Sequence, residues 1–268
     1  LIHHAKYVSW IVYVVAMSLL FATRWMISVE DDGILNWLMI RINVLIACEE
    51  SQTEMMAFRN RGFNAYSCDI QKPRRGADLR YQILGDVTPF LHGSVQFTTM
   101  DGKRHKVSQW HLIVCHPPCT YLSKVGSPHM YVDGKFNWAR LAQMIQARRF
   151  FMECLNAKAP YVAVENPLPM RRANLPKPDC FVQPYWYGHP YSKKTLYWLR
   201  NLPPLMPDAD MADFKEYVRS SRGKYRSRTF TGIANAMADQ WGNFILDELQ
   251  QRTTGVRVRE ISAYPVKV

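Results

Sequence analysis

The sequence predicts an α/β protein with a buried, largely parallel sheet. Apolar runs of strand length at 42–47, 63–68, 111–115 and 161–164 alternate with segments of helical spacing. Strands that are apolar throughout are typical of sheets covered on both faces. The chain has 268 residues, of which 48% are hydrophobic, so it is long enough to bury such a core. We therefore expect one main domain with helices on both faces of its sheet.

The first 38 residues differ from the rest of the chain. Residues 7–22 are almost wholly apolar, but they fall short of the roughly 20 residues that a membrane-spanning helix needs. A marginal anchor or a secretory signal stays open, although no small-x-small cleavage site stands out. Met39 stands immediately before the first clear strand. We expect residues 1–38 to be an extension outside the working domain, and we do not expect that domain to bind a membrane.

After Met39 the pattern is that of a βαβ unit. Residues 42–47 are expected to form a strand, 52–61 a helix that ends at Gly62, and 63–68 a second strand that closes on Asp69. A loop rich in Lys, Arg and Gly follows.

The next segments continue the alternation of strands and helices. Residues 81–84 are expected to form a short strand, and 95–107 a surface hairpin that turns at Asp101-Gly102. Residues 137–155 have helical spacing, with arginines at polar positions. This helix is expected to cover one face of the sheet.

Prolines and basic residues dominate the chain beyond Glu165. Nine prolines between 167 and 207 favour loops and edge elements. Residues 215–228 are rich in Lys and Arg with interleaved tyrosines, which fits phosphate contact with base stacking as well as it fits a solvated loop. Helical spacing returns at 233–251.

The charge and the cysteines limit the partners and the compartment. The net charge is +12, and residues 1–38 hold two basic and three acidic side chains, so the remainder carries +13. Such a balance favours a polyanion such as nucleic acid, although some soluble proteins are merely basic. Six cysteines show no closely paired framework, so a cytoplasmic protein is expected. Cys115, His116 and Cys119 lie close together with His111, but no second CxxC pair follows, so no metal site is expected.

Two short motifs carry the candidate chemistry. His116-Pro117-Pro118-Cys119 follows the apolar run at 112–114, and Glu165-Asn166 follows the run at 161–164. Both motifs should lie beyond the carboxyl ends of buried strands, where open α/β sheets place their ligands. Two prolines restrict the loop and present the thiol, whereas an inert buried cysteine is the alternative.

From about 39 to 251 the chain resembles the DNA cytosine C5-methyltransferase family, in a compact form such as phages encode. Residues 116–123 are similar to the family's GPPCQxxS segment and 164–166 to its ENV segment. Residues 187–196 resemble its QxRxR strand, with Lys193 and Thr195 at the arginine positions, and 232–237 resemble its late GNAV segment.

The resemblance implies a fold and a division of the chain. The fold would be a Rossmann-like S-adenosylmethionine-dependent methyltransferase sheet with helices on both faces. Residues 39–199 would form the catalytic domain, 200–231 a very small, irregular, basic target-recognition region, and 232–268 a C-terminal helix and tail that return to the catalytic domain. So small a recognition region suggests a short or relaxed target sequence.

The resemblance also implies S-adenosylmethionine as the methyl donor. The loop after the first strand stands where the family has FxGxGG, but Cys48, Glu50 and Ser51 replace glycines. Asp69 would hold the ribose and Asp86 the adenine amino group, although turn or cap chemistry is the alternative for both. Glu49 or Glu50 would pair with the methionine ammonium. The other residues expected at the cofactor are Ala47, Ile70, Val87, Pro117, Asn235 and Ala236.

The implied reaction assigns roles to a few side chains. Cys119 would add to C6 of cytosine and make C5 able to accept a methyl group. Glu165, with a pKa that burial is expected to raise, would protonate N3, and Asn166 would help to fix its loop. Lys193 and Lys194 would lower the thiol pKa or bind phosphate, unless they are ordinary surface lysines.

Double-stranded DNA with a flipped base is the expected partner, bound by a monomer. The expected nucleic-acid contacts are Ser123, Lys193, Lys194, Arg222, Lys224, Arg226 and Arg228. RNA or a free nucleotide as the substrate, and a related methyl donor, stay open.

Two other functions compete with this one. Residues 116–121 also resemble the Asp/Asn-Pro-Pro-aromatic loop of amino-methyltransferases, which act on adenine N6 or cytosine N4, but the aromatic residue is displaced and the acid or amide is missing. The lost glycines of the first loop would suit a non-catalytic module that binds cofactor or nucleic acid.

Overall fold

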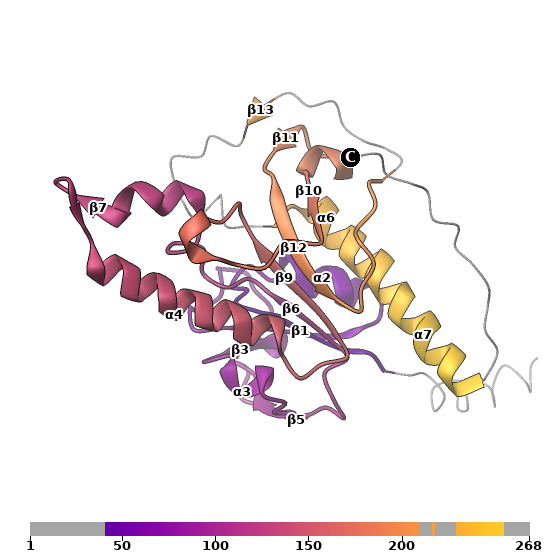
Figure 1. Cartoon of the computed structure of the whole chain (residues 1–268). Coiled ribbons are helices and arrows are strands. Elements are labelled where there is room, and N and C mark those ends of the chain that lie inside the picture. The colour runs from indigo at the N-terminus through magenta and orange to yellow at the C-terminus, as the bar shows by residue number, and fades with distance from the viewer. Residues whose placement is uncertain (1–40, 209–215, 218–228, 255–268) are drawn as a thin grey trace, which may run out of the picture. The chain divides into compact units, whose positions relative to one another are not determined.

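A computed structural model describes residues 41–208, 216–217 and 229–254 of the chain, and the predicted extension at 1–38 lies outside them. The centre of the described part is one seven-stranded sheet (Figure 1). Its order is β10 (Cys180–Val182), β12 (Thr195–Arg200), β9 (Tyr161–Asn166), β6 (Leu112–Cys115), β1 (Asn43–Ala47), β2 (Asn64–Asp69) and β3 (Gln82–Leu84).

Most neighbours in this sheet are parallel. β1 pairs in parallel with both β2 and β6, and β6 pairs in parallel with β9, with Cys115 opposite Val164. β12 runs antiparallel between β9 and β10. After β3 the chain returns to the other side of β1 to form β6, so the connections on the two sides of β1 run in opposite directions. This arrangement creates a topological switch point between β1 and β6.

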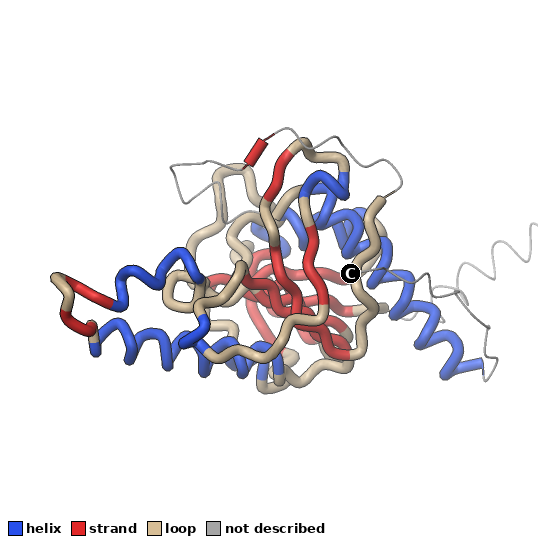
Figure 2. The backbone as a smooth tube through the Cα atoms, turned by 45° about the horizontal axis from the view of Figure 1, so that its top comes forward, coloured by secondary structure: helices blue, strands red, loops and turns tan. Residues whose placement is uncertain are grey.

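Helices cover both faces of the sheet, as expected. α4 (Trp138–Leu155) lies on one face with the short α3 (Thr88–Leu91), and α2 (Thr53–Asn60) lies on the other with α6 (Thr231–Ala236) and α7 (Gly242–Thr254) (Figures 1 and 2). A π-helical segment at 237–241 joins α6 to α7.

Successive residues of β12 show how the two faces differ. The ring of Trp198 lies 4.9 Å from that of Phe151 in α4, whereas Tyr197 lies 5.9 Å from Trp241 on the opposite face. This alternation follows from the period of two in a strand. The predicted Rossmann-like α/β fold class is therefore confirmed.

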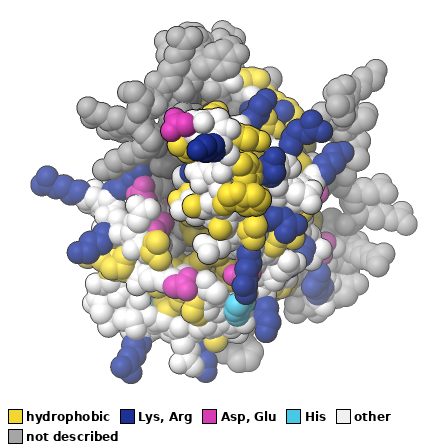
Figure 3. All heavy atoms as spheres, turned by 60° about the vertical axis from the view of Figure 1, so that its left-hand side comes forward, with side chains coloured by type: hydrophobic (Ala, Val, Ile, Leu, Met, Phe, Trp, Pro, Cys, Tyr) yellow, Lys and Arg dark blue, Asp and Glu magenta, His cyan; other side chains and the backbone are white. Residues whose placement is uncertain are grey.

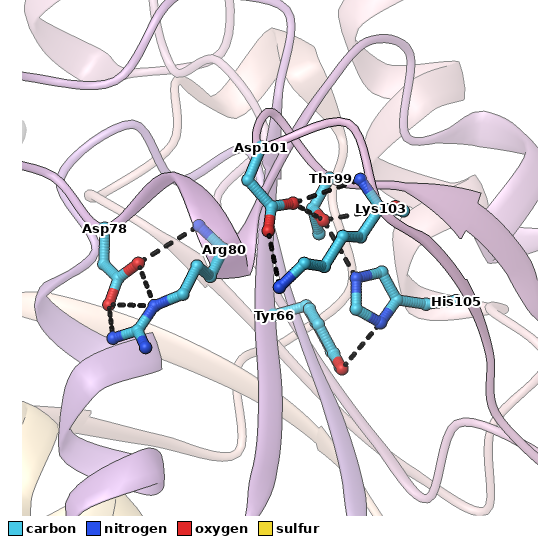
Figure 4. Close-up of polar contacts among 7 residues, drawn as sticks. All are labelled: Tyr66, Asp78, Arg80, Thr99, Asp101, Lys103 and His105. Atoms are coloured by element: carbon cyan, nitrogen blue, oxygen red, sulfur yellow. Dashed lines mark hydrogen bonds and ion pairs between the residues drawn. The ribbon is translucent and has the colours of Figure 1, made fainter.

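The predicted surface hairpin is present as β4 (Gln96–Thr98) and β5 (Arg104–Lys106). Its turn contains Gly102 at φ 84°, a conformation that favours glycine. The Thr99 hydroxyl donates to Asp101 at 2.6 Å and contacts His105 at 2.9 Å, and His105 in turn contacts the hydroxyl of Tyr66 in β2 at 3.5 Å (Figure 4). These contacts attach the hairpin to the sheet.

The expectation of loops and edge elements after Glu165 is partly wrong. β12 is an internal strand of the sheet, and β10 forms its edge. β12 has the sequence TLYWLR and lies between Pro190 and Pro203, so no proline interrupts its hydrogen bonds. The prolines lie instead in the connections, together with the short helices η3 (Arg171–Ala173) and η4 (Pro184–Tyr187) and with β11 (Tyr191–Ser192), which pairs with β13 (Glu216–Tyr217).

A projecting segment between β6 and α4 was not expected. The 3-10 helix η2 (Lys124–Met130) leads into a two-stranded hairpin of β7 (Tyr131–Val132) and β8 (Lys135–Phe136), and α4 follows directly. In Figures 1 and 2 this hairpin extends to the left, away from the sheet. We call residues 124–138 the arm.

Candidate active site

The candidate site lies at the carboxyl edge of the sheet, beside the switch point. The backbone N–H of His116, which follows β6, donates to the carbonyl of Ala47 at the end of β1 at 2.9 Å. The loops after β1 and β6 therefore begin next to each other. Open α/β sheets bind ligands at this position.

Cys119 is the one cysteine among the described residues that is exposed. The N–H groups of Leu122 and Ser123 donate to its carbonyl at 3.0 and 2.9 Å, which closes a tight turn directly after it. Pro117 is buried and Pro118 is exposed. The thiol is thus presented on a fixed loop, and the alternative of an inert buried cysteine does not hold.

Hydrogen bonds join the Cys119 loop to the Glu165 loop. The side-chain amide of Asn166 donates to the carbonyl of Pro117 at 3.1 Å. Further along, the N–H of Lys124 donates to Leu168 at 2.8 Å and that of Met170 to Leu122 at 2.7 Å. The thiol and the carboxyl group therefore stand on two loops that are bonded to each other at several points.

Glu165 is partly exposed, with 18% of its side chain accessible. Burial tends to raise its pKa, but the hydrogen bond from His116 and the positive charges of Lys193 and His116 outweigh burial, so the pKa is lowered from its ordinary value. The expectation of a raised pKa is therefore wrong. The sequence placed Glu165 correctly at a strand end but gave no sign of the cation beside it.

Sequence reasoning missed Glu54, which lies in the first turn of α2 and is completely buried. Its Oε2 lies 2.8 Å from Nε2 of His116, and Nδ1 of the same ring lies 3.4 Å from Oε2 of Glu165. Acidic residues are common in first helical turns, because they interact favourably with the helix dipole. For this reason the sequence does not distinguish Glu54 from an exposed surface residue.

The loop after β1 contains two residues in the left-handed backbone conformation that glycine favours, although neither of them is glycine. Cys48 has φ 62° and Gln52 has φ 59°, both in the left-handed region. The N–H of Cys48 donates to the carbonyl of Cys68 at 2.7 Å, which holds the loop against the end of β2. The two non-glycine residues thus take a turn that the sequence would not predict for them.

Glu49 is used by the fold itself. One carboxylate oxygen accepts from the N–H of Glu54 at 2.7 Å, and the other accepts from Met55 at 3.3 Å and from the Ser67 hydroxyl at 2.9 Å. Glu49 therefore caps the start of α2, with Ser51 also donating to it at 3.3 Å. Burial, followed by the charge of Glu54, raises the pKa of Glu49 to about 7.

Glu50 is also occupied, because Arg74 donates to both of its oxygens at 2.6 and 2.7 Å. A pairing of Glu49 with a methionine ammonium would have to compete with the donors that its oxygens already accept. A pairing through Glu50 would have to compete with Arg74.

Asp69 lies at the end of β2, next to the loop after β1, and burial raises its pKa. Its Oδ1 accepts from the N–H of Gln71 at 2.7 Å. The next residue, Ile70, is 76% exposed. An acid and an exposed apolar side chain thus stand together at the sheet edge.

Asp86 has the cap chemistry that was the alternative for it. Its Oδ1 accepts from both the N–H and the hydroxyl of Thr88, at 2.9 and 2.8 Å, at the start of α3. The neighbouring Val87 is buried in the core.

The structure does not bring Asn235 to the other expected cofactor residues. Its Oδ1 accepts from Arg61, the residue that ends α2, at 3.4 Å, and Arg61 also pairs with Asp239. The loop after β1 adjoins the opposite end of α2. Ala236 is buried between the helices of this face.

The expected basic contacts divide into two groups. Lys193 and Lys194 precede β12; the N–H of Lys193 donates to Gln183 at 2.9 Å, and Nζ of Lys194 lies 4.1 Å from the ring centre of Phe181. Ser123 is largely buried. The remaining expected contacts lie outside the described residues, and they are Arg222, Lys224, Arg226 and Arg228.

The arm adds a basic and aromatic surface that was not expected from the sequence. Trp138 is 73% exposed and Tyr131 is 53% exposed. The guanidinium of Arg172 lies 5.1 Å from the ring centre of Phe136, and Lys135 is exposed beside it. Figure 3 shows this side of the molecule, with hydrophobic side chains in the centre and Lys and Arg around them.

Arg140, in the first turn of α4 directly after the arm, contacts the Cys119 loop. Its guanidinium donates to the carbonyl of Thr120 at 2.6 Å and lies 4.4 Å from the ring centre of Tyr121. A Cβ atom at Gly126 of the arm would lie 2.8 Å from the carbonyl oxygen of Thr120, so the arm itself packs closely against the turn after Cys119.

The described residues contain neither a metal-binding cluster nor a membrane-spanning helix. No group of three or more His, Cys, Asp or Glu in these ranges is arranged to hold a metal ion. No helix of the described part has the length and apolar character needed to cross a membrane.

Comparisons with known proteins yield a weak structural similarity. No family model and no curated protein matches the sequence. Among solved structures, the chain is similar to a protein assigned as a DNA modification methyltransferase and encoded within a prophage of E. coli. The two are 12% identical with a TM-score of 0.37, and the match covers 63% of this chain and 51% of that one, so it spans about half the length of that protein.

Proposed function

We propose that this protein is an S-adenosylmethionine-dependent DNA methyltransferase that acts on C5 of cytosine, with Cys119 as its nucleophile. One observation carries the proposal. The exposed thiol follows β6, the Glu165 carboxylate lies at the carboxyl end of the adjacent parallel strand β9, and the Asn166–Pro117 hydrogen bond joins the end of β9 to the Cys119 loop. This arrangement allows a thiol and an acid to reach the same heterocycle.

The reaction needs both groups because C5 of cytosine is a weak nucleophile. The Cys119 thiolate forms a bond to C6, the C5=C6 electron pair moves to C4–C5, and the C4=N3 pair moves to N3, which takes a proton by way of Glu165. The electron-rich C5 then takes the methyl group. A base removes the C5 proton, the C5=C6 bond re-forms, and Cys119 leaves.

S-adenosylmethionine would supply an electrophilic methyl group carried on a sulfonium. Its adenosine half fits the residues present: Asp69 has a second carboxylate oxygen for ribose hydroxyls, and the exposed Ile70 offers an apolar surface for adenine. Ala47 at the end of β1 and the loop residues Cys48 and Pro117 would line the same binding site. Asp86 and Val87 would line the side of the site opposite them. The methionine half lacks a free acid at Glu49.

The arm supports DNA as the partner. Lys135 of the arm and Arg172 of η3, which contacts the arm, supply positive charge, and Trp138 and Tyr131 supply exposed rings suited to stack on bases. The arm follows the Cys119 turn directly, so DNA bound to it would lie beside the thiol. A base in a duplex must leave the stack to reach the thiol, which costs on the order of a few kcal/mol.

Trapping with 5-fluorocytosine DNA and labelled S-adenosylmethionine tests the proposal. Fluorine at C5 cannot leave as a proton does, so the enzyme stays covalently bound to its substrate. We expect a denaturation-resistant complex from the wild type and from Cys180→Ser, which changes a half-buried cysteine in the edge strand β10. We expect none from Cys119→Ser.

The same assay separates the competing functions. Methyl transfer that survives Cys119→Ser undiminished would indicate an amino-methyltransferase. Cofactor binding by calorimetry without any transfer by the wild type would indicate a binding module.

A further inference from the structure

A buried chain of three side chains leads from α2 to the candidate site. Glu54 Oε2 lies 2.8 Å from His116 Nε2, and His116 Nδ1 lies 3.4 Å from Glu165 Oε2. The other oxygen of Glu54 accepts from the Thr229 hydroxyl at 2.6 Å. The histidine thus stands between two acids that come from different elements of the fold.

This geometry favours the doubly protonated ring. A neutral imidazole has a single N–H and could donate to only one of the two carboxylates, whereas the imidazolium donates to both. Burial tends to lower the pKa of His116, but the charge of Glu54 and the hydrogen bonds to Glu165 and Glu54 outweigh it and raise the pKa well above its ordinary value.

Other charged groups lie around the chain. The electrostatic surroundings of His116 and its two partners include an acid on the loop after β1, an acid at the end of β2, a lysine before β12 and a phenol in β12. These residues are Glu49, Asp69, Lys193 and Tyr197. Glu54 makes the largest raising contribution to the pKa of His116. Glu165 is consequently held ionised beside a proton that His116 carries.

We propose that Glu54 and His116 form a proton relay behind Glu165, in which His116 stores the proton destined for N3 of the target base and Glu54 positions the ring. The proposal rests on the proposed function. Glu54 and His116 are positioning residues, since Glu165 is the group that would meet the base.

The relay balances with the addition step. As Cys119 bonds to C6 and an electron pair reaches N3, the Glu165 carboxylate takes the Nδ1 proton of His116 and passes a proton on to N3, which returns Glu165 to its ionised form. The ring becomes neutral but keeps its Nε2–H, which still donates to Glu54. When Cys119 leaves and the base re-forms, the N3 proton returns along the same path. The ring is then ready for another turnover.

The relay predicts a descending alkaline limb in the pH profile of kcat, because His116 must hold its proton. Glu54→Gln removes the largest raising contribution, so the limb is expected to move to lower pH by about 1–3 units. Glu54→Asp retracts the carboxylate and should move it less, in the same direction. Glu153→Gln removes an acid of α4 outside the site and should leave the limb unchanged.

A second measurement does not depend on turnover. ¹⁵N chemical shifts of the His116 ring, assigned by comparison with His116→Gln, report its protonation in the wild type without substrate. We expect both ring nitrogens to be protonated at pH 7.5 in the wild type, and the titration to fall to lower pH in Glu54→Gln. Circular dichroism verifies that each variant is folded.

The outcomes distinguish the relay from the function on which it rests. Suppose that the wild type traps 5-fluorocytosine DNA. The relay is then overturned if the alkaline limb does not move in Glu54→Gln, or if the His116 ring is neutral at pH 7.5. The proposed function stands in either case. A wild type that forms no covalent complex overturns both. A shift of the limb that matches the shift of the ring titration supports the relay.

Discussion

The Cys119 loop after β6 and the carboxyl end of β9 form one pair of segments at the edge of the sheet. The loop after β1 lies at the same edge but uses its polar residues differently. In the pair, Cys119 is exposed and Glu165 is partly exposed. In the loop after β1, Glu49 caps α2 and Glu50 pairs with Arg74. An acid at a strand end is therefore no sufficient sign of a ligand site, because nearby backbone N–H groups compete for it.

The largest effect should come from the exposed pair. Glu165→Gln keeps the shape of the side chain but cannot transfer a proton, so we expect kcat for methyl transfer to fall about 10²–10⁴-fold. Binding of S-adenosylmethionine, measured by calorimetry, should stay the same. Unchanged turnover would mean that Glu165 takes no part in the mechanism. The functional contrast between the Cys119 and Glu165 region and the loop after β1 would then not hold.

Glu49 should affect stability through its pKa. The folded-state pKa is raised to about 7. Its contribution to stability is therefore fully present below the unfolded pKa and is lost as the pH rises through about 7, by up to about 3 kcal/mol. Glu49→Gln cannot ionise, so the stability of this variant relative to the wild type should rise between pH 4.5 and 7.5.

Urea unfolding at a series of pH values measures this difference. Glu153→Gln, which removes a partly exposed acid of α4, serves as the control. A constant difference between Glu49→Gln and the wild type across this range would mean that Glu49 is not a buried structural acid.

The arm offers a third comparison, between surface charges near the site and away from it. Lys135→Gln combined with Arg172→Gln should weaken DNA binding about tenfold. The slope of the logarithm of the binding constant against the logarithm of the salt concentration should become smaller in magnitude by about 0.9 for each phosphate that the variant no longer neutralises. Fluorescence anisotropy over a salt series measures both. Arg149→Gln on the exposed side of α4 is the matched control, and an equal weakening there would deny the arm a specific role.

Asp86 should give the smallest effect. Asp86→Ala removes the cap of α3 and should cost about 1 kcal/mol, whereas Asp86→Asn keeps a good capping residue and should cost little. Thermal unfolding measures these changes. Weaker cofactor binding by the stable Asn variant would show that Asp86 has a second use besides capping.

The sequence predicted the sheet strands up to β9 and the helices α2 and α4, because buried parallel strands and long helices have strong periodic patterns. It did not predict β12 as an internal strand, since the prolines of the neighbouring connections obscured a short proline-free run. The hairpin of β7 and β8 was missed as well, because its strands have only two residues each.

The candidate site was predictable only as far as its motifs are local. Cys119 and Glu165 each follow an apolar run, so their positions at the sheet edge were visible in the sequence. Glu54 meets His116 across 62 positions of the chain, and no local pattern encodes that pair. The lowered pKa of Glu165 depends on its neighbour His116 and could not be inferred from the sequence around Glu165.

The reversed direction of β12 has a consequence for the chemistry. An antiparallel strand starts at the edge where its parallel neighbours finish, so Lys193, just before β12, arrives at the same edge as Glu165, which pairs with this strand through Tyr197. Without that reversal, the positive charge would be delivered to the opposite side of the molecule. The antiparallel strand β12 thus places the positive charge of Lys193 at an edge of the sheet that is otherwise formed by the carboxyl ends of parallel strands.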